Sequence, residues 1–245
     1  AILATKAGLP SVLSVALAGF VTAAAGCVVS LPVIRISGIY LAMVTLGFAE
    51  FIRLLAINLE GLTGGPLGIA RIPPLSVFGR PLGTEAERFY FLYAAAALLV
   101  LLFVRITRTR FGRSLTAIRA SAEAPASIGI PCDATKMAAF LLSGLYSGVA
   151  GGLYAHFDRF ISPDTFQFDL SVLVLCMVVV GGMGSVAGSL AGAGILVVLL
   201  EVFQPLGDYR LIAYGALLMV MITWFPRGLA GGLRSAAGRV FRRRV

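Results

Sequence analysis

Charged residues are scarce in this chain. They make up 13% of its 245 residues, whereas about 25% is usual for a soluble domain. Hydrophobic residues reach 59%, above the usual share of about 45–50%. This balance excludes an ordinary soluble protein and indicates one that crosses a membrane several times.

Cysteine and histidine are also scarce, which leaves little for metal chemistry. Cys27, Cys132 and Cys176 lie far apart, and His156 is the single histidine. A metal site needs several such ligands at short spacing, and the apolar segments contain no convincing pair of a nucleophile and a base. We therefore expect neither an enzyme centre nor a cofactor bound by this chain.

Two further absences concern nucleotides and nucleic acids. The chain contains no Gly-Lys-Ser or Gly-Lys-Thr sequence, which ends the phosphate-binding loop of P-loop ATPases. Any ATP that drives this protein must therefore be hydrolysed by another polypeptide. The net charge is +9, but most of the charge lies in two clusters beside apolar runs, so we expect no nucleic-acid partner.

Long apolar runs predict the membrane spans, which are residues 10–31, 38–59, 89–104, 137–156, 170–203 and 211–225. A crossing needs about 20 residues, so residues 170–203 are too long for one, and glycines interrupt them at 181–188. We expect two short crossings or broken half-helices joined by a glycine turn there. The predicted fold is an all-α polytopic membrane protein, a single domain over residues 1–245 with about six to eight transmembrane segments.

The distribution of charge orients these spans. Residues 105–136 carry six Lys and Arg side chains against two acidic ones, and the tail, residues 227–245, carries six Arg and no acid. Basic loops stay in the cytoplasm, so we place both segments there, and the tail is most simply an anchor to membrane lipid. Counting spans backwards places residues 60–88 and 158–169 outside.

The basic loop, residues 105–136, has the pattern of a surface helix. Leu115, Ile118 and Ala122 recur at helical spacing and form one apolar face, which Arg113 and Arg119 flank. This pattern predicts a short amphipathic helix at the membrane surface.

Breaks follow that helix. Pro125 forces a break or a new helix start, residues 129–131 (Gly-Ile-Pro) form another break, and we expect Asp133 to cap the next span. The result is a short helix–turn–helix. The pattern alone fits either a positive-inside anchor on lipid head groups or a docking surface for an ATPase.

Two opposite charges lie within a predicted span. Glu50 and Arg53 are three residues apart and therefore share a helix face. A charge within a span is costly unless it is paired or wetted, so the pair is either a structural salt bridge or part of a transport path. The loop that follows, residues 58–68, is rich in glycine and proline, which favour turns.

Glycine recurs every fourth residue in two places, at 144, 148 and 152 and again at 184, 188 and 192. This spacing lets another backbone approach closely, and for the first set we expect simple helix packing. The second set coincides with the interrupted span. Broken helices can line a substrate path, so packing and a path both stay open for these glycines.

Several separated motifs carry a family resemblance. Residues 35–50 read Arg-Ile-Ser-Gly-Ile-Tyr-Leu-Ala-Met-Val-Thr-Leu-Gly-Phe-Ala-Glu, with Asn58 and a Leu-Thr-Gly-Gly at 62–65 after them. Residues 110–119 read Arg-Phe-Gly-Arg-Ser-Leu-Thr-Ala-Ile-Arg. The later motifs are Gly-Ile at 129–130, Ala-Gly-Gly-Leu-Tyr-Ala at 150–155, Ile-Ser-Pro at 161–163, Gly-Gly-Met-Gly-Ser at 181–185 and Pro-Arg-Gly-Leu at 226–229. Over residues 1–229 the chain resembles the M-type permeases of branched-chain amino-acid ABC importers, the LivM-like family.

The resemblance implies a multi-pass permease subunit in the bacterial cytoplasmic (inner) membrane. Its implied partners are a second permease subunit, two ATP-binding subunits that use the ATP, and an external solute-binding protein. Its implied solutes are branched-chain or related small amino acids, although similar permeases carry urea or short amides. The resemblance also implies one membrane segment before Ala1.

Two sets of site residues follow. The resemblance implies a coupling helix within the cytoplasmic loop that docks on the ATPase, formed by Gly112, Arg113, Leu115, Ala117, Ile118, Arg119, Glu123 and Gly129. The predicted translocation path comprises Glu50, Arg53, Asn58, Thr63, Gly64, Gly65, Gly181, Gly182 and Gly184.

The alternative to an ATP-driven importer is an ion-coupled secondary transporter or channel. Glu50, Arg53 and the broken helix would then form its site. A second ionisable cluster deep in the membrane would favour this alternative, but Glu201 is the only other acid in a predicted span.

Overall fold

Helices make up nearly all of the structure. The computed structural model describes residues 1–34, 36, 39–77, 80–120, 124–203 and 219. The long helices are α2 (Ser11–Val33), α3 (Ile39–Asn58), α5 (Glu85–Thr107), α8 (Cys132–Asp158), α9 (Phe168–Gly181) and α10 (Val186–Phe203). The shorter elements are α1 (Ile2–Thr5), α4 (Glu60–Thr63), α6 (Arg110–Ala120), α7 (Ala124–Ser127), η1 (Gly65–Leu67) and η2 (Pro163–Phe166). The one hairpin in the described ranges pairs β1 (Ser76–Val77) with β2 (Arg80–Pro81).

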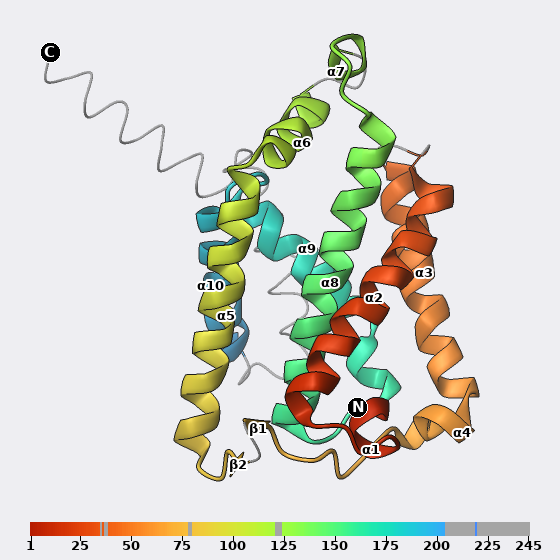
Figure 1. Cartoon of the computed structure of the whole chain (residues 1–245), viewed down its shortest axis with the longest axis vertical. Helices are drawn as coiled ribbons and strands as arrows, with labels where there is room; N and C mark the ends of the chain where they lie inside the picture. Colours follow the sequence, from red (N-terminus) through yellow and green to blue (C-terminus); the bar gives the residue numbers. More distant parts are fainter. Residues whose placement is uncertain (35, 37–38, 78–79, 121–123, 204–218, 220–245) are drawn as a thin grey trace, which may run out of the picture. The chain divides into compact units, whose positions relative to one another are not determined.

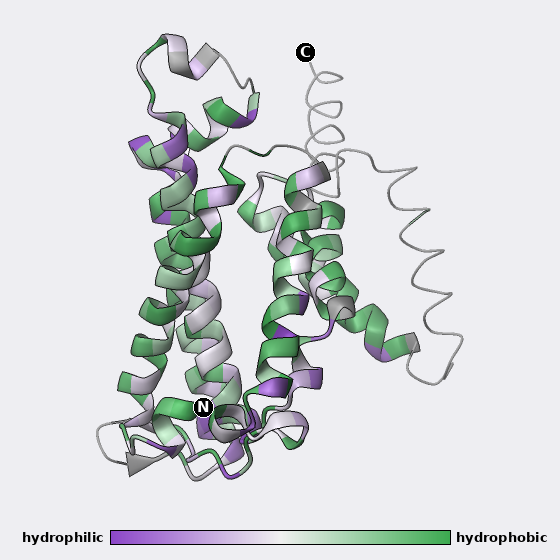
Figure 2. Cartoon of the chain, turned by 90° about the vertical axis from the view of Figure 1, so that its right-hand side faces the viewer, coloured by the Kyte–Doolittle hydropathy of each residue, from purple (hydrophilic) through white to green (hydrophobic). Residues whose placement is uncertain are grey.

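The expected all-α polytopic membrane architecture is confirmed, apart from this small hairpin. Four helical segments of the described chain are long and apolar enough to cross a membrane: Ser11–Val33, Glu85–Thr107, Cys132–Asp158 and Pro163–Gly181. The 20 residues of α3 add a helix about 30 Å long. Figure 2 shows apolar residues along these helices and polar ones toward their ends. The predicted span 211–225, except residue 219, and the tail 227–245 lie outside the described residues.

Two helix starts differ from the sequence expectation for local reasons. Helix α5 begins at Glu85, a turn before the predicted span, because Thr84 and Glu87 form a capping box that satisfies free backbone N–H groups. The expected cap at Asp133 is wrong. Helix α8 begins after Pro131, and Asp133 lies in its first turn without a side-chain capping bond. Proline before a helix sets its start without a side-chain acceptor.

The chain folds as two compact units, residues 1–167 and 168–245. The first unit is organised around the close contact of α2 with α8 (Figure 1). A Cβ added to Gly148 would lie 2.6 Å from the Ala18 carbonyl oxygen, and one added to Gly144 would lie 2.6 Å from the Thr22 carbonyl oxygen. A Cβ added to Gly152 would lie 3.2 Å from the Val15 Cα. The packing role predicted for the first glycine set is therefore confirmed.

At each end of the first unit, hydrogen bonds join segments that are far apart in the sequence. At the basic end, defined by residues 105–136, the Lys136 ammonium group donates to the Ile34 carbonyl oxygen at 3.4 Å. At the loop end, defined by residues 60–84 and 159–167, Ile69 and Ile161 pair by two backbone hydrogen bonds. The segments that the charge pattern placed outside, residues 60–88 and 158–169, therefore meet through Ile69 and Ile161 at one end of the unit.

The second unit contains the predicted break. Helices α9 and α10 are joined at Gly182–Ser185, where Gly182 and Gly184 adopt φ values of 107° and 87°. Only glycine adopts such angles readily, so the glycine turn expected from the sequence is confirmed. Beside it the two helices touch backbone to backbone, since a Cβ on Gly192 would lie 2.6 Å from the Gly181 nitrogen.

This contact leads to a matched prediction. Gly192→Ala should lower the stability of the purified protein by about 1–3 kcal/mol, because the new methyl group meets rigid backbone. Gly194→Ala should be neutral or slightly stabilising, because nothing lies within 4 Å of the added Cβ and alanine favours helix. Thermal unfolding in detergent compares the two variants. Equal melting temperatures would contradict the close α9–α10 contact.

Candidate functional site

Glu50 and Arg53 form a paired charge on α3. Arg53 Nη2 donates to Glu50 Oε1 at 2.6 Å, and Arg53 Nε reaches both carboxylate oxygens at 3.0 Å. The side chains are 24% and 38% exposed for Arg53 and Glu50. Two-point contact between guanidinium and carboxylate is the strongest common geometry for such a pair. The predicted pairing is confirmed, and each of the two side chains keeps part of its surface exposed.

The pair lies at the edge of an exposed apolar surface of α3. Glu50 and Arg53 are half-buried, and this helix contacts both η1 and η2. Met43, seven residues before Glu50 and so on the same side of the helix, is 63% exposed, and Phe51 is 56% exposed. Such a surface suits lipid or a partner helix, so Glu50 lies next to a part of α3 that another apolar surface can cover.

An acidic side chain belongs to a neighbouring element. Asp164 lies in η2, which contacts α3, and its side chain is exposed. Counting 1.5 Å per residue from the end of α3 at Asn58, Arg53 lies about 8 Å and Glu50 about 12 Å along the helix. Arg53 is therefore the member of the pair nearer to the loop end.

The predicted path residues after α3 form a tight turn. Thr63 Oγ1 donates to the Ala56 carbonyl oxygen at 2.6 Å and accepts a bond from the Gly65 N–H at 3.2 Å. Gly64 and Gly65 have φ values of 78° and 60°. The hydroxyl thus ends the helix and starts the turn, a role that local hydrogen-bonding side chains commonly have. Asn58 Nδ2 donates back to the Leu54 carbonyl oxygen at 2.7 Å.

This turn leads into a contact that the sequence did not indicate. Gly68, with φ at 70°, lies so close to the backbone of Ile161 and Ser162 that an added Cβ would be 2.7 Å from the Ser162 Cα. Gly68 lies three residues after the motif at 62–65, and the motif at 161–163 is about 100 residues further along the chain. Gly68 and the second motif meet next to the η1 and η2 elements that contact α3.

Sequence reasoning also missed two polar contacts that hold the loop end. His156 is 1% exposed, and its Nδ1 lies 2.8 Å from the Pro73 carbonyl oxygen. A carbonyl only accepts, so Nδ1 carries the proton. The Ser11 hydroxyl accepts from the Ser76 N–H at 2.6 Å. In the sequence, the only hint of these two contacts was a single histidine beside apolar residues.

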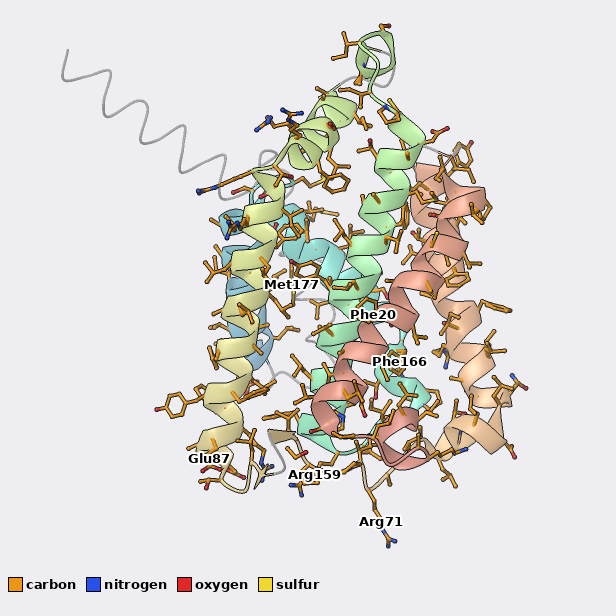
Figure 3. All side chains as sticks on the ribbon, in the orientation of Figure 1. Phe20, Arg71, Glu87, Arg159, Phe166 and Met177 are labelled. Carbon is orange, nitrogen blue, oxygen red and sulfur yellow. The ribbon has the colours of Figure 1, made fainter. Side chains whose placement is uncertain are left out.

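Figure 3 shows charged residues of the loop end, including Arg71 and Arg159.

At the basic end, α5 turns into α6 at residues 108–109, and Gly112 in the first turn of α6 packs against the end of α5. This residue is buried, and an added Cβ would fall within 2.6 Å of the Thr107 backbone. The exposed Arg113 donates from Nη1 to the Arg108 carbonyl oxygen at 3.2 Å. The corner therefore depends on a glycine that the prediction had assigned to coupling.

Helix α6 has the two faces that its pattern predicted. Leu115, Ala117 and Ile118 are half-buried, whereas Arg113 and Arg119 are exposed. Helix α6 also contacts α5 and α8. Its apolar residues therefore lie toward the protein, and its arginines are presented outward.

The second helix of the predicted coupling segment, α7, is shorter than α6. Pro125 lies in the first turn of α7, as its ring requires. Gly129 has a φ of 81°, and the Ile130 N–H bonds back to the Pro125 carbonyl oxygen at 3.0 Å. Two helices, α6 and α7, therefore stand where the helix–turn–helix was predicted. Residues 121–123 between them lie outside the described residues, and with them Glu123 and Ala122 of the predicted apolar face.

The remaining predicted path residues belong to the second unit. Gly181 is buried, and an added Cβ would lie 2.8 Å from Ser189 Cα. Gly182 and Gly184 form the turn between α9 and α10. Helix packing and turn geometry account for these three glycines, and their place in a translocation path stays a prediction.

Comparison with known proteins decides the family. The family model described as "branched-chain amino acid transport system / permease component" matches residues 1–223. The chain belongs to this family of permease components. No solved structure matches the permease.

Individual relatives agree with this placement. The permease is 39% identical over 236 residues to the high-affinity branched-chain amino acid transport system permease protein LivM of Salmonella typhimurium, and 38% identical to LivM of Escherichia coli. Each match covers 87% of this chain and 56% of the relative, so the chain spans about half the length of these relatives. The xylose transport system permease protein XylH of Escherichia coli is 32% identical over 47% of this chain and 32% of its own length.

Proposed function

We propose that this chain is a transmembrane permease subunit of an ATP-driven importer for branched-chain or related small amino acids. The family match over residues 1–223 carries this proposal. The amino-acid assignment is supported by the two LivM relatives, which match a larger share of the chain than the sugar permease does.

The form of the basic end supports coupling to a separate ATPase. Helix α6 presents Arg113 and Arg119 outward and is braced against α5 and α8. Since α5 and α8 are long apolar helices, a force on α6 would reach two candidate membrane spans directly. The sequence contains no P-loop motif, so a partner must hydrolyse the ATP.

The proposed assembly contains a second permease subunit, two ATP-binding subunits and an external solute-binding protein, in the bacterial inner membrane. ATP-driven closure of the ATPases would move residues 113–129, and the solute would pass near Glu50, Arg53 and the turn at residues 63–65. Access to that path would alternate between the two sides of the membrane.

Reversing the outward charge of α6 tests the coupling role. Arg113→Glu/Arg119→Glu should reduce the amount of ATPase that copurifies from native membranes by about tenfold or more, because like charges across an interface cost several kcal/mol. The measurement is the ratio of ATPase to permease in the purified complex. Retention of the wild-type ratio would contradict docking through α6.

A control separates docking from a change in net charge. Arg239→Glu/Arg242→Glu in the tail removes the same charge and should leave the ratio unchanged. If no ATPase copurifies with the wild-type chain, the importer proposal fails. Solute uptake that follows an ion gradient and ignores ATP would then establish the secondary-transporter alternative.

A further inference from the structure

The charged pair on α3, a predicted span, has a property that a purely structural salt bridge does not require. Arg53 and Glu50 are 24% and 38% exposed, although a charge within a span is costly when it is not enclosed. A salt bridge that only stabilised α3 would be cheapest when fully covered. The open part of this pair therefore indicates an aqueous or polar occupant beside it.

The chemistry of the pair defines that occupant. Arg53 binds a carboxylate through two donors, with Nη2 at 2.6 Å and Nε at 3.0 Å from Glu50 oxygens. A free α-amino acid carries one carboxylate and one ammonium group on the same carbon. It therefore offers each member of the pair a substitute for its present partner.

We propose that Glu50 and Arg53 form a recognition site for zwitterionic solutes. The solute carboxylate takes the place of Glu50 on the Arg53 guanidinium, and the solute ammonium group takes the place of Arg53 on Glu50. Every charge stays paired during this exchange, so opening the pair leaves no lone charge in the span. The inference rests on the proposed transport function and specifies its solute class.

Neutral solutes cannot make the same exchange. Urea or a short amide that separated Glu50 from Arg53 would leave both charges without a counter-charge, which is strongly unfavourable inside a span. The geometry therefore points to amino acids rather than amides, a choice that the residue pattern left open.

The test uses the complete importer in proteoliposomes, with leucine as the probe. Glu50→Gln/Arg53→Gln removes both charges without leaving either one unpaired. We expect leucine transported per ATP hydrolysed to fall at least about 100-fold, because sites built for polar groups discriminate by large factors. Assembly with the ATPase should persist. A transport ratio within about twofold of wild type would show a merely structural pair and would overturn the proposal.

Two further variants make the result decisive. Arg53→Lys keeps the ion pair but loses the two-point contact, and we expect a fall of about tenfold in the same ratio; an unchanged ratio would contradict the site. Glu85→Gln/Arg88→Gln neutralises an i,i+3 pair of charges at the start of α5 and should behave as wild type.

Failure of the proposed function has a different signature. It would appear in the wild-type protein, as leucine uptake that does not depend on ATP, whereas failure of the zwitterion site appears only in the α3 variants. Transport of the neutral analogue 4-methylpentanamide by wild type at the rate of leucine would also overturn the site.

Discussion

Replacement of Gly148 by valine should disrupt the α2–α8 contact and prevent a stable permease from forming. The added Cβ would lie 2.5 Å from Thr22 Oγ1, 2.6 Å from the Ala18 carbonyl oxygen and 2.8 Å from Gly19 Cα. Two of these atoms belong to backbone and cannot rotate away, so the helices must separate. We expect a loss of about 3 kcal/mol or more, at the upper end of overpacking effects, measured by thermal unfolding in detergent.

Gly151 supplies the matched control for this substitution. It lies in the same helix, is exposed, and has nothing within 4 Å of an added Cβ. Gly151→Val introduces the same side chain and the same helix propensity, so any difference between the variants measures packing alone. If both variants unfolded at the same temperature, α2 and α8 would not pack through Gly148.

Substitution of Gly68 by alanine should open the loop end of the first unit. Its backbone, at φ 70° and ψ −164°, lies in a region that is essentially open only to glycine and costs another residue about 1–3 kcal/mol. The methyl group would also meet Ser162 Cα at 2.7 Å. With a further 1–3 kcal/mol or so for overpacking, the total reaches about 2–6 kcal/mol. Faster cleavage by protease at residues 64–82, together with a lower melting temperature, measures this loss.

Gly8 separates conformational strain from the clash. It has a φ of 62° and nothing within 4 Å of an added Cβ, so Gly8→Ala carries only a conformational cost. Gly68→Ala should be the more damaging by at least the cost of overpacking. Equal losses of stability would show that the close contact of Gly68 with Ile161–Ser162 does not form.

Local features were the most predictable from the sequence. The Glu50–Arg53 pair follows from a spacing of three on one helix, and the α9–α10 break follows from glycines whose φ values few other residues adopt. The amphipathic α6 was likewise visible in the spacing of Leu115 and Ile118. Asp133 shows the limit of such reasoning, since a plausible cap residue gives way to a proline two positions earlier.

Contacts between distant segments were not predictable. The glycine spacing in α8 indicated a face that another backbone approaches, but many apolar helices could have supplied that backbone. In the sequence Gly68 was one glycine of a predicted loop, and His156 was only a single histidine, too few for a metal site. Nothing in the spacing of either residue identifies Ser162 or Pro73 as its partner.

The sequence by itself determined the membrane-spanning architecture, the glycine turn, the paired charges of α3 and the two-faced helix at the basic end. All of these depend on residues within a few turns of one another, where backbone geometry relates spacing to position. Only the tertiary structure decided that α2 packs on α8, that Gly68 meets residues 161–162, and that η2 contacts α3. These contacts depend on which apolar helix packs against which. Hydrophobicity alone does not specify the partner, because helices of similar apolarity offer nearly equivalent surfaces.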